Sequence, residues 1–172
     1  MQGPTPPSAV EGASGGAGGT RMVEARPPAS SASVRARMQR TGRRDTAAER
    51  AVRSELHRRG LRYFVDRRVV PGTRRRVDIV FPRLEIAVFV DGCFWHSCPV
   101  HGTVPKANRA WWVAKLAANE ARDRATDAQL EQAGWTVLRF WEHEDPAVVA
   151  DTIEAAVRSG GHRGRRTETT SM

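Results

Sequence analysis

The spacing of apolar and polar residues in the middle of the chain predicts first an amphipathic helix. Val52 and Leu56 share one helical face. Thr46 and Glu49 stand three residues apart, the spacing of a capping box in which hydroxyl and carboxylate satisfy free backbone donors reciprocally. Gly60 follows the last periodic residue and is predicted to stop the helix.

Apolar runs bounded by turn residues then predict strands and two more helices. The third predicted strand is almost wholly apolar, so it is expected at the centre of the sheet. The strands are predicted at Leu61–Val65, Val77–Phe81 after the Pro71-Gly72 turn, Ile86–Val90 and Trp135–Trp141, and the helices at Arg109–Ala133 and from Pro146. The order αβββαβα predicts an α/β fold with a mixed central sheet flanked by helices.

Composition divides the chain into four parts. In residues 1–33, 22 of 33 positions are Gly, Pro, Ala or Ser, and this extension is predicted to be disordered because it cannot bury a core. Residues 34–44 form a basic arm of the kind that follows a DNA backbone. Residues 45–158 are predicted to hold one folded domain, and residues 159–172 a flexible tail.

Charge indicates an anionic partner. The chain has 28 Lys and Arg against 19 Asp and Glu, a net charge of +9, and such basic proteins usually bind nucleic acid. No apolar run approaches the ~18 residues of a membrane span, so no membrane association is expected. The two cysteines, Cys93 and Cys98, exclude a disulfide framework and favour a reducing compartment.

A group of metal-ligand residues follows the third strand. Cys93, Cys98 and His101 have the spacing C-x4-C-x2-H, and His143 follows the fourth strand. Cys and His are the usual ligands of structural zinc, and four of them complete its tetrahedron. If the third and fourth strands are neighbours, their ends bring the four residues together. The pattern predicts a structural zinc site, the alternative being two buried thiols beside incidental histidines.

Acidic residues on the second and third strands predict a second metal site. Asp78 stands inside an otherwise apolar strand, where an unpaired carboxylate is costly. Asp91 ends the next strand, and two carboxylates at neighbouring strand ends suit Mg2+. His96 is placed to take a proton from water at such a metal. The alternatives are a salt bridge from Asp78 to Arg74–Arg76, a loop-starting role for Asp91, and zinc binding by His96.

Two pairs of adjacent aromatic residues cannot all face one core. Phe94-Trp95 lies in the polar loop, and Trp111-Trp112 opens the long helix, so at least one residue of each pair is expected at the surface. Apolar side chains inserted between base steps kink duplex DNA, which makes these residues candidate wedges. Ordinary packing is the alternative.

Three polar residues share one face of the long helix. Lys115, Asn119 and Asp123 follow one another at intervals of four. They would form either an ion-pair ladder or a set of polar groups directed at a phosphate or at the catalytic histidine.

These motifs together resemble the very short patch repair endonucleases, which nick DNA to begin repair of T:G mismatches left by deaminated 5-methylcytosine. The resemblance covers about residues 34–145 and is most specific in the run Asp-Gly-Cys-Phe-Trp-His at 91–96. That family is similar to the PD-(D/E)xK nucleases. The resemblance therefore implies a restriction-endonuclease-like core with a structural zinc loop.

The resemblance also implies catalytic roles. Asp78 would be the principal Mg2+ ligand, helped by the main-chain carbonyl of Val90. His96 would be the general base or proton shuttle, supported by Glu49 and Asp123.

The DNA contacts and the zinc ligands follow from the same resemblance. Phe94, Trp95 and Trp112 would form a wedge beside the mismatch, while the arm around Met38 enters from the opposite groove. The further expected DNA contacts are Arg37, Arg44, Lys115 and Asn119. Structural Zn2+ would be bound by Cys93, Cys98, His101 and His143.

The chain departs from the best-known members of the family at three positions. They have His where this chain has Asp91, Thr where it has Val90, and Cys where it has His143. Because Asp91 is a better Mg2+ ligand than histidine, the catalytic metal is expected to bind more strongly or in a rearranged site.

The sequence therefore predicts a Mg2+-dependent endonuclease that nicks 5′ to the thymine of a T:G mismatch. The protein is expected to be cytoplasmic, nucleoid-associated and monomeric, to act on double-stranded DNA, and to precede mismatch-repair proteins and a DNA polymerase. One alternative is a restriction-type or structure-specific nuclease with another DNA substrate. Another is a non-catalytic zinc-containing DNA-binding module, against which the position of Asp78 argues.

Overall fold

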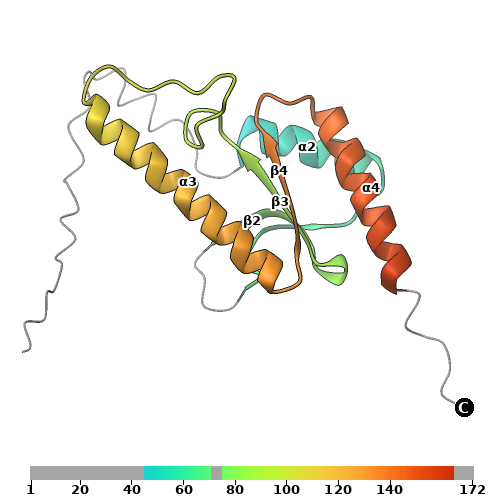
Figure 1. Ribbon diagram of the computed structural model, residues 1–172. Coiled ribbons are helices and arrows are strands. Elements are labelled where there is room, and N and C mark those ends of the chain that lie inside the picture. The colour runs from blue at the N-terminus through green and yellow to red at the C-terminus, as the bar shows by residue number, and fades with distance from the viewer. Residues whose placement is uncertain (1–44, 71–74, 165–172) are drawn as a thin grey trace, which may run out of the picture.

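The computed structural model describes residues 45–70 and 75–164, with only the backbone for 161–164, as a four-stranded mixed sheet with three helices (Figure 1). The order of elements is the predicted one, with a short 3-10 helix, η1, added. The elements are α2 (Ala47–Arg58), β1 (Phe64–Arg67), β2 (Val77–Phe81), η1 (Pro82–Leu84), β3 (Ile86–Asp91), α3 (Arg109–Gln132), β4 (Thr136–Trp141) and α4 (Pro146–Gly164). In this part of the chain no helix has both the length and the apolar character to cross a membrane.

The sheet places β3 between β2 and β4, in the strand order β1-β2-β3-β4. Every residue of β3 is buried, which confirms the prediction of a central strand. The pairs β1–β2 and β2–β3 are antiparallel, whereas β3 and β4 run parallel with Asp91 opposite Trp141. Because parallel strands end at the same edge, the loops after β3 and β4 start side by side.

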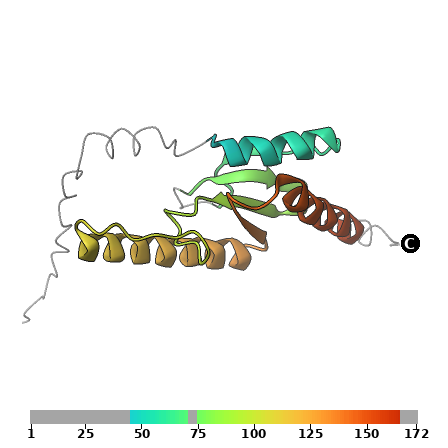
Figure 2. The same ribbon diagram turned by 90° about the horizontal axis from the view of Figure 1, so that it is seen from above.

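Helices cover both faces of the sheet (Figure 2). On one face, α2 and α4 pack Leu56 and Ile153 against Ile79 and Val88 of the central strands. On the other face, α3 contributes Leu130 to a smaller cluster of strand residues. The first half of α3 extends past the strands, beside the loop that follows β3 (Figures 1 and 2).

The predicted cap at the start of α2 is present, with one difference. The backbone N–H of Glu49 donates to Thr46 Oγ1 at 3.2 Å, but Glu49 Oε2 accepts from the backbone N–H of Asp45, at 2.9 Å, rather than from Thr46. Gly60 lies just past the helix with φ of 75°, the left-handed conformation that suits glycine. The cap holds the buried Glu49 at the end of α2 that lies near β2.

The structure corrects both ends of the first predicted strand, which runs to Arg67 rather than to Val65. The first strand begins at Phe64 rather than at Leu61, because the Leu61 N–H donates to the Leu56 carbonyl at 3.1 Å and so completes the end of α2. Helix α4 continues to Gly164, past the domain end expected at residue 158. The predictions for residues 1–44, the Pro71-Gly72 turn and residues 165–172 lie outside the described part.

The continuation of α4 leads to a stability prediction at Gly160. A Cβ there would lie 3.6 Å from Cβ and 3.7 Å from Cδ2 of Leu84, which is ordinary van der Waals contact. Since glycine is costly inside a helix, Gly160→Ala is expected to stabilise the protein by about 0.5–1 kcal/mol in urea unfolding. Gly134→Ala is the matched control: with φ of 87° it should destabilise. A loss of stability in Gly160→Ala would contradict the prediction.

Candidate active site and metal centre

Asp78 lies in β2 and faces the backbone of the neighbouring strand. Its Oδ2 accepts a hydrogen bond from the Val90 N–H at 2.9 Å. Burial raises the pKa of Asp78 to about 7, and the negative charges of Glu49 and Asp91 add to this effect. Because its protonated form is favoured, the carboxyl group is ready to exchange its proton for a cation. The alternative salt bridge has no support from Arg76, which pairs with Asp66 instead.

His96 is oriented by a carboxylate on α3. Its Nδ1 lies 2.7 Å from Oδ2 of Asp123 and 3.5 Å from Oδ1 of Asp91. Burial lowers the pKa of His96, but the hydrogen bond to Asp123 and the charge of Asp91 outweigh it, so the pKa is raised overall. A carboxylate at Nδ1 holds the proton there and leaves Nε2 as the acceptor. The geometry suits a general base.

Asp91 has a partner that the sequence analysis misses. Both of its carboxylate oxygens accept from Nη1 of Arg139, at 2.8 and 2.7 Å, while Arg139 Nε contacts both oxygens of Asp127. Burial lowers the pKa of Arg139, but the contacts with Asp127 and Asp91 raise it by more. The pKa is therefore above its usual value, and the guanidinium stays positively charged. Asp91 is therefore an ion-pair partner in this structure, and its predicted Mg2+ ligation stays a prediction. The sequence does contain a signal for this ion pair: an arginine inside the mostly apolar run of β4 needs an acidic partner.

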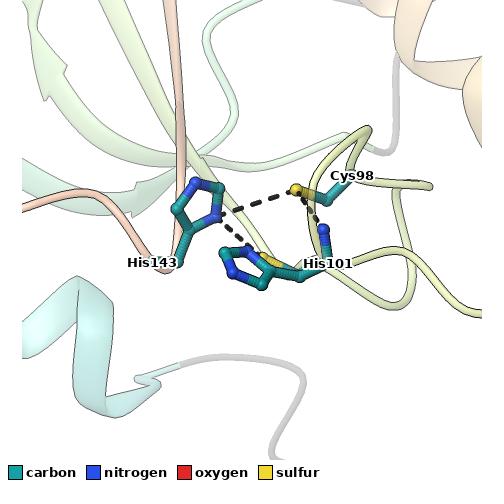
Figure 3. A group of neighbouring side chains, drawn as sticks. Cys98, His101 and His143 are labelled. Atoms are coloured by element: carbon teal, nitrogen blue, oxygen red, sulfur yellow. Dashed lines mark hydrogen bonds between the residues drawn. The ribbon is translucent and has the colours of Figure 1, made fainter.

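The structure brings the four predicted zinc ligands together, three of which, Cys98, His101 and His143, are labelled in Figure 3. The ligand atoms of Cys93, Cys98, His101 and His143 all lie within 4.8 Å of one another. His143 Nδ1 is 3.1 Å from Cys93 Sγ and 3.7 Å from Cys98 Sγ. In Figure 3 His143 reaches from the turn after β4 toward the loop after β3, which carries Cys98 and His101. His96, the alternative zinc ligand, is not part of this group and contacts Asp123.

The two thiols differ in how readily they ionise. Burial raises the pKa of Cys98, but backbone N–H groups, that of His101 first, outweigh it and lower the pKa overall. Burial and the neighbouring Cys98 raise the pKa of Cys93 to about 11. Two adjacent thiolates repel each other unless a cation lies between them, and Zn2+ binds two Cys and two His tetrahedrally. The donor set fits such a metal.

The loop and the turn are tied to each other by Glu142, another residue that the sequence analysis misses. Its Oε1 accepts from the Cys93 N–H at 2.7 Å, and its own N–H donates to the Asp91 carbonyl at 2.9 Å. A Cβ at Gly92 would lie 3.7 Å from Glu142 Oε2, which is ordinary van der Waals contact, so the position of this carboxylate does not depend on a glycine there. No motif reveals this role, which depends on the pairing of β3 with β4.

The aromatic residues of the loop after β3 and of α3 form one cluster. Phe94 contacts Trp95 and Trp112 edge to face, with ring centroids 5.0 and 5.3 Å apart. Trp112 is buried and also packs against Trp111, whereas Phe94 and Trp95 are half-buried. Of the three predicted wedge residues, Phe94 and Trp95 are therefore the accessible ones, and Trp112 supports them.

The polar face of α3 points into the site rather than forming an ion-pair ladder. Asp123 contacts His96, and the buried Asn119 donates from Nδ2 to the Trp95 carbonyl at 2.9 Å. Lys115 is half-buried on the same face. The predicted contacts of Arg37, Met38 and Arg44 lie outside the described residues.

One carboxylate holds a ring nitrogen of His96, and Asp91 connects this histidine to Asp78, a buried carboxyl group that a cation would ionise. Such a combination is suited to hydrolysis of a phosphodiester. These groups place the protein in the class of nucleases. Residues 30–101 match the family described as DNA mismatch endonuclease Vsr. The chain belongs to the Vsr endonuclease family and is an endonuclease.

Curated relatives support the same family. The type II nicking enzyme V.NaeI of Lentzea aerocolonigenes is 46% identical over 122 residues, which cover 67% of this chain and 74% of the relative. The type II nicking enzyme V.XorIIP of Xanthomonas oryzae pv. oryzae is 42% identical, over 62% of this chain and 77% of the relative. The DNA mismatch endonuclease Vsr of Escherichia coli K12 is 37% identical, over 58% of this chain and 62% of the relative.

Proposed function

We propose that this protein is a Mg2+-dependent DNA endonuclease that nicks 5′ to the thymine of a T:G mismatch left by deaminated 5-methylcytosine, and so initiates very short patch repair. The observation that carries the proposal is the His96–Asp123 pair, which Asp91 connects to Asp78: Asp91 Oδ1 lies 3.5 Å from His96 Nδ1, and the charge of Asp91 helps to raise the pKa of Asp78. Membership of the Vsr family and the relative named a mismatch endonuclease support it.

Asp78 would hold the catalytic metal, with the carbonyl of Val90 beside it. Mg2+ bound there would stabilise negative charge developing on the scissile phosphate. Glu49, buried close to Asp78 at the start of α2, adds negative charge that favours a bound cation. The chemistry of the donors fits Mg2+, which prefers carboxylate and carbonyl oxygens.

His96 would act as the general base. With Nδ1–H donating to Asp123, Nε2 is free to accept a proton from the attacking water. Asp123 fixes the orientation of the ring and stabilises the imidazolium that forms, as a second carboxylate does in other hydrolytic sites. Asp123 lies on α3 and His96 in the loop after β3, so the contact between them depends on how α3 packs against that loop.

Zn2+ would be a structural ion at Cys93, Cys98, His101 and His143. Two sulfur and two nitrogen ligands fill its tetrahedral coordination and leave no position for substrate. Its effect would be to hold the loop after β3, which carries His96, against the turn after β4.

Phe94 and Trp95 would supply the mismatch specificity. Both are half-buried, and both belong to the loop that carries His96. Insertion of apolar side chains between base steps costs a few kcal/mol of unstacking, and the cost is least at a mispaired step. A protein with this wedge nicks where the duplex opens most easily. Acting there, it would work as a monomer on nucleoid DNA in the cytoplasm, ahead of mismatch-repair proteins and a DNA polymerase.

A pool of labelled duplexes tests the proposal. Each duplex carries one T:G mismatch with randomised flanking base pairs, and a matched pool carries C:G at the same position. Nicking 5′ to the mismatched T, dependent on Mg2+ and absent from the matched pool and with EDTA, is the expected result. Equal nicking of both pools would replace the repair function with that of a restriction-type nuclease. No nicking in either pool would overturn the proposal.

Asp123→Asn provides a prediction for the acid–base part of the site. Asn keeps the size of the side chain but cannot stabilise an imidazolium, so single-turnover nicking is expected to fall by about 10–100-fold. DNA binding should stay within about twofold, because Asp123 has no direct part in it. Nicking rates at saturating DNA and Kd values measured without divalent metal check this. An unchanged rate would remove Asp123 from the mechanism.

A further inference from the structure

An arginine on β4 connects Asp91 with helix α3, and the mechanism proposed above does not use it. Arg139 lies opposite Phe89 in the β3–β4 pair, and its guanidinium stands over the Phe89 ring, 4.3 Å from the centroid. Nη1 contacts both oxygens of Asp91, at 2.8 and 2.7 Å, and Nε contacts both oxygens of Asp127, at 3.0 and 2.9 Å. One cation thus joins the central strand, the edge strand and the helix.

Stability alone does not explain this cluster. The side chain of Arg139 is 22% exposed and that of Asp91 only 11%. Removing such charges from water offsets much of their attraction, and apolar residues of similar size often do as well or better. The surrounding contacts between α3 and the sheet are in fact apolar, through Leu130. A buried charge network in that setting fixes the geometry of the groups it holds.

The group held most closely is the Asp91 carboxylate, which lies between two sites. On one side, Asp91 Oδ1 is 3.5 Å from His96 Nδ1, which Asp123 also contacts. On the other side is Asp78, where the metal would bind and which is close enough to feel the charge of Asp91. The bonds from Nη1 of Arg139 reach both oxygens of this carboxylate and so restrain its orientation between the two sites.

We propose that Arg139 is a positioning residue that holds Asp91 beside His96 and keeps it out of the metal site at Asp78. The inference rests on the proposed function and deepens it. With Asp91 paired to Arg139, the metal site contains one carboxylate ligand, Asp78. The imidazole of His96 is then steadied by two carboxylates, one from α3 and one from β3.

Metal binding tests the assignment without any nicking. Mn2+, which favours the same oxygen ligands as Mg2+, is titrated into the full chain without DNA and followed by electron paramagnetic resonance. Asp78→Asn is expected to abolish the binding, whereas Asp91→Asn should keep the affinity within about twofold. Arg139→Met should raise the affinity by about three- to tenfold, because it frees Asp91 to reach the metal.

Nicking provides the second readout. Arg139→Met is expected to lower the single-turnover rate at saturating DNA by about 10–100-fold without changing the DNA Kd, and Arg139→Lys should restore part of the rate. Arg59→Met is the matched control, because Arg59 has a side chain 17% exposed and also bridges two carboxylates, Asp151 and Glu154, between α2 and α4. It should lower Tm as Arg139→Met does, but leave the nicking rate unchanged.

The outcomes separate this inference from the proposed function. If Asp91→Asn weakens Mn2+ binding as much as Asp78→Asn does, Asp91 is a metal ligand and only the inference is overturned. If the two arginine variants change the nicking rate equally, Arg139 is merely structural and the inference is likewise overturned. If Asp78→Asn leaves Mn2+ binding intact, the proposed metal site itself is wrong, and the inference is overturned with it.

Discussion

Asp78→Asn is expected to reduce nicking by at least about a hundredfold while the protein stays folded and binds DNA, because the loss of charge stabilisation at a reacting phosphate has effects of this size. The amide oxygen can still accept the hydrogen bond that the Val90 N–H donates to Asp78 Oδ2. The structural contact is therefore kept, and only the ionisable group is lost. Single-turnover nicking in Mg2+, with DNA binding measured in its absence, checks the prediction.

The same variant makes a prediction about pH. Burial first, and then the negative charges of Glu49 and Asp91, raise the pKa of Asp78 from 3.8 to about 7. Between these values the folded state holds a proton that the unfolded state has lost, so the contribution of Asp78 to stability falls as pH rises. In Asp78→Asn this loss is absent. Without divalent metal, the free energy of unfolding of the variant should rise relative to that of the wild type between pH 4 and pH 8, by an amount on the order of a few kcal/mol.

Urea unfolding at several pH values measures this gain. Glu131→Gln is the control, because Glu131 is exposed on α3 and its replacement should leave the pH dependence of stability as it is in the wild type. A constant difference between Asp78→Asn and the wild type across the range would contradict the assignment. Saturating Mg2+ should reduce the difference at pH 8, since a bound cation compensates the buried carboxylate.

Cys98→Ala is expected to have the largest effect on stability. The variant should lose one equivalent of bound Zn2+ and about 3–5 kcal/mol, which corresponds to a Tm lower by about 10 °C for a protein of this size. The loop after β3 has few core residues of its own, so the ligand cluster is what would hold it to the turn after β4. Nicking should also fail, because His96 lies between two of the metal ligands. Metal analysis, thermal melting and nicking rates test the three effects.

His57→Ala is the matched control for this variant, because His57 is exposed on α2, away from the cluster. It should retain the metal, the Tm and the nicking activity. Treatment of the wild type with a strong chelator should reproduce the Tm of Cys98→Ala, and added Zn2+ should reverse the change. A metal-free wild-type protein with an unchanged Tm would contradict the structural role of the ion.

Local chemistry explains what the sequence predicted well. Gly60 and Pro146 mark helix ends by their backbone conformations, and the apolar run of β3 identifies a buried strand without any knowledge of its neighbours. The Cys and His spacing indicated the ligand cluster, because a short loop restricts where three of the four residues can lie. Asp78 stood out for a similar reason, as a charge in an apolar strand.

The parts that were missed depend on pairing between distant segments. The ion pair of Asp91 with Arg139 was not predicted, because Arg139 is 48 residues away and meets Asp91 only because β3 and β4 run parallel. The start of β1 was misplaced because Leu61 was counted as a strand residue although it caps α2. Glu142 has no recognisable motif, since its role comes from the turn that it occupies.

Helix α3 carries three contacts on a single face: Asn119 to the Trp95 carbonyl, Asp123 to His96, and Asp127 to Arg139. Each of these residues is four positions from the next, so the three contacts together fix both the rotation and the axial position of the helix relative to the site. One inserted residue would turn everything on one side of it by about 100° relative to the rest. Evolution can therefore vary the exposed alanines of this helix freely, while insertions and deletions between Asn119 and Asp127 are expected to be selected against in active relatives.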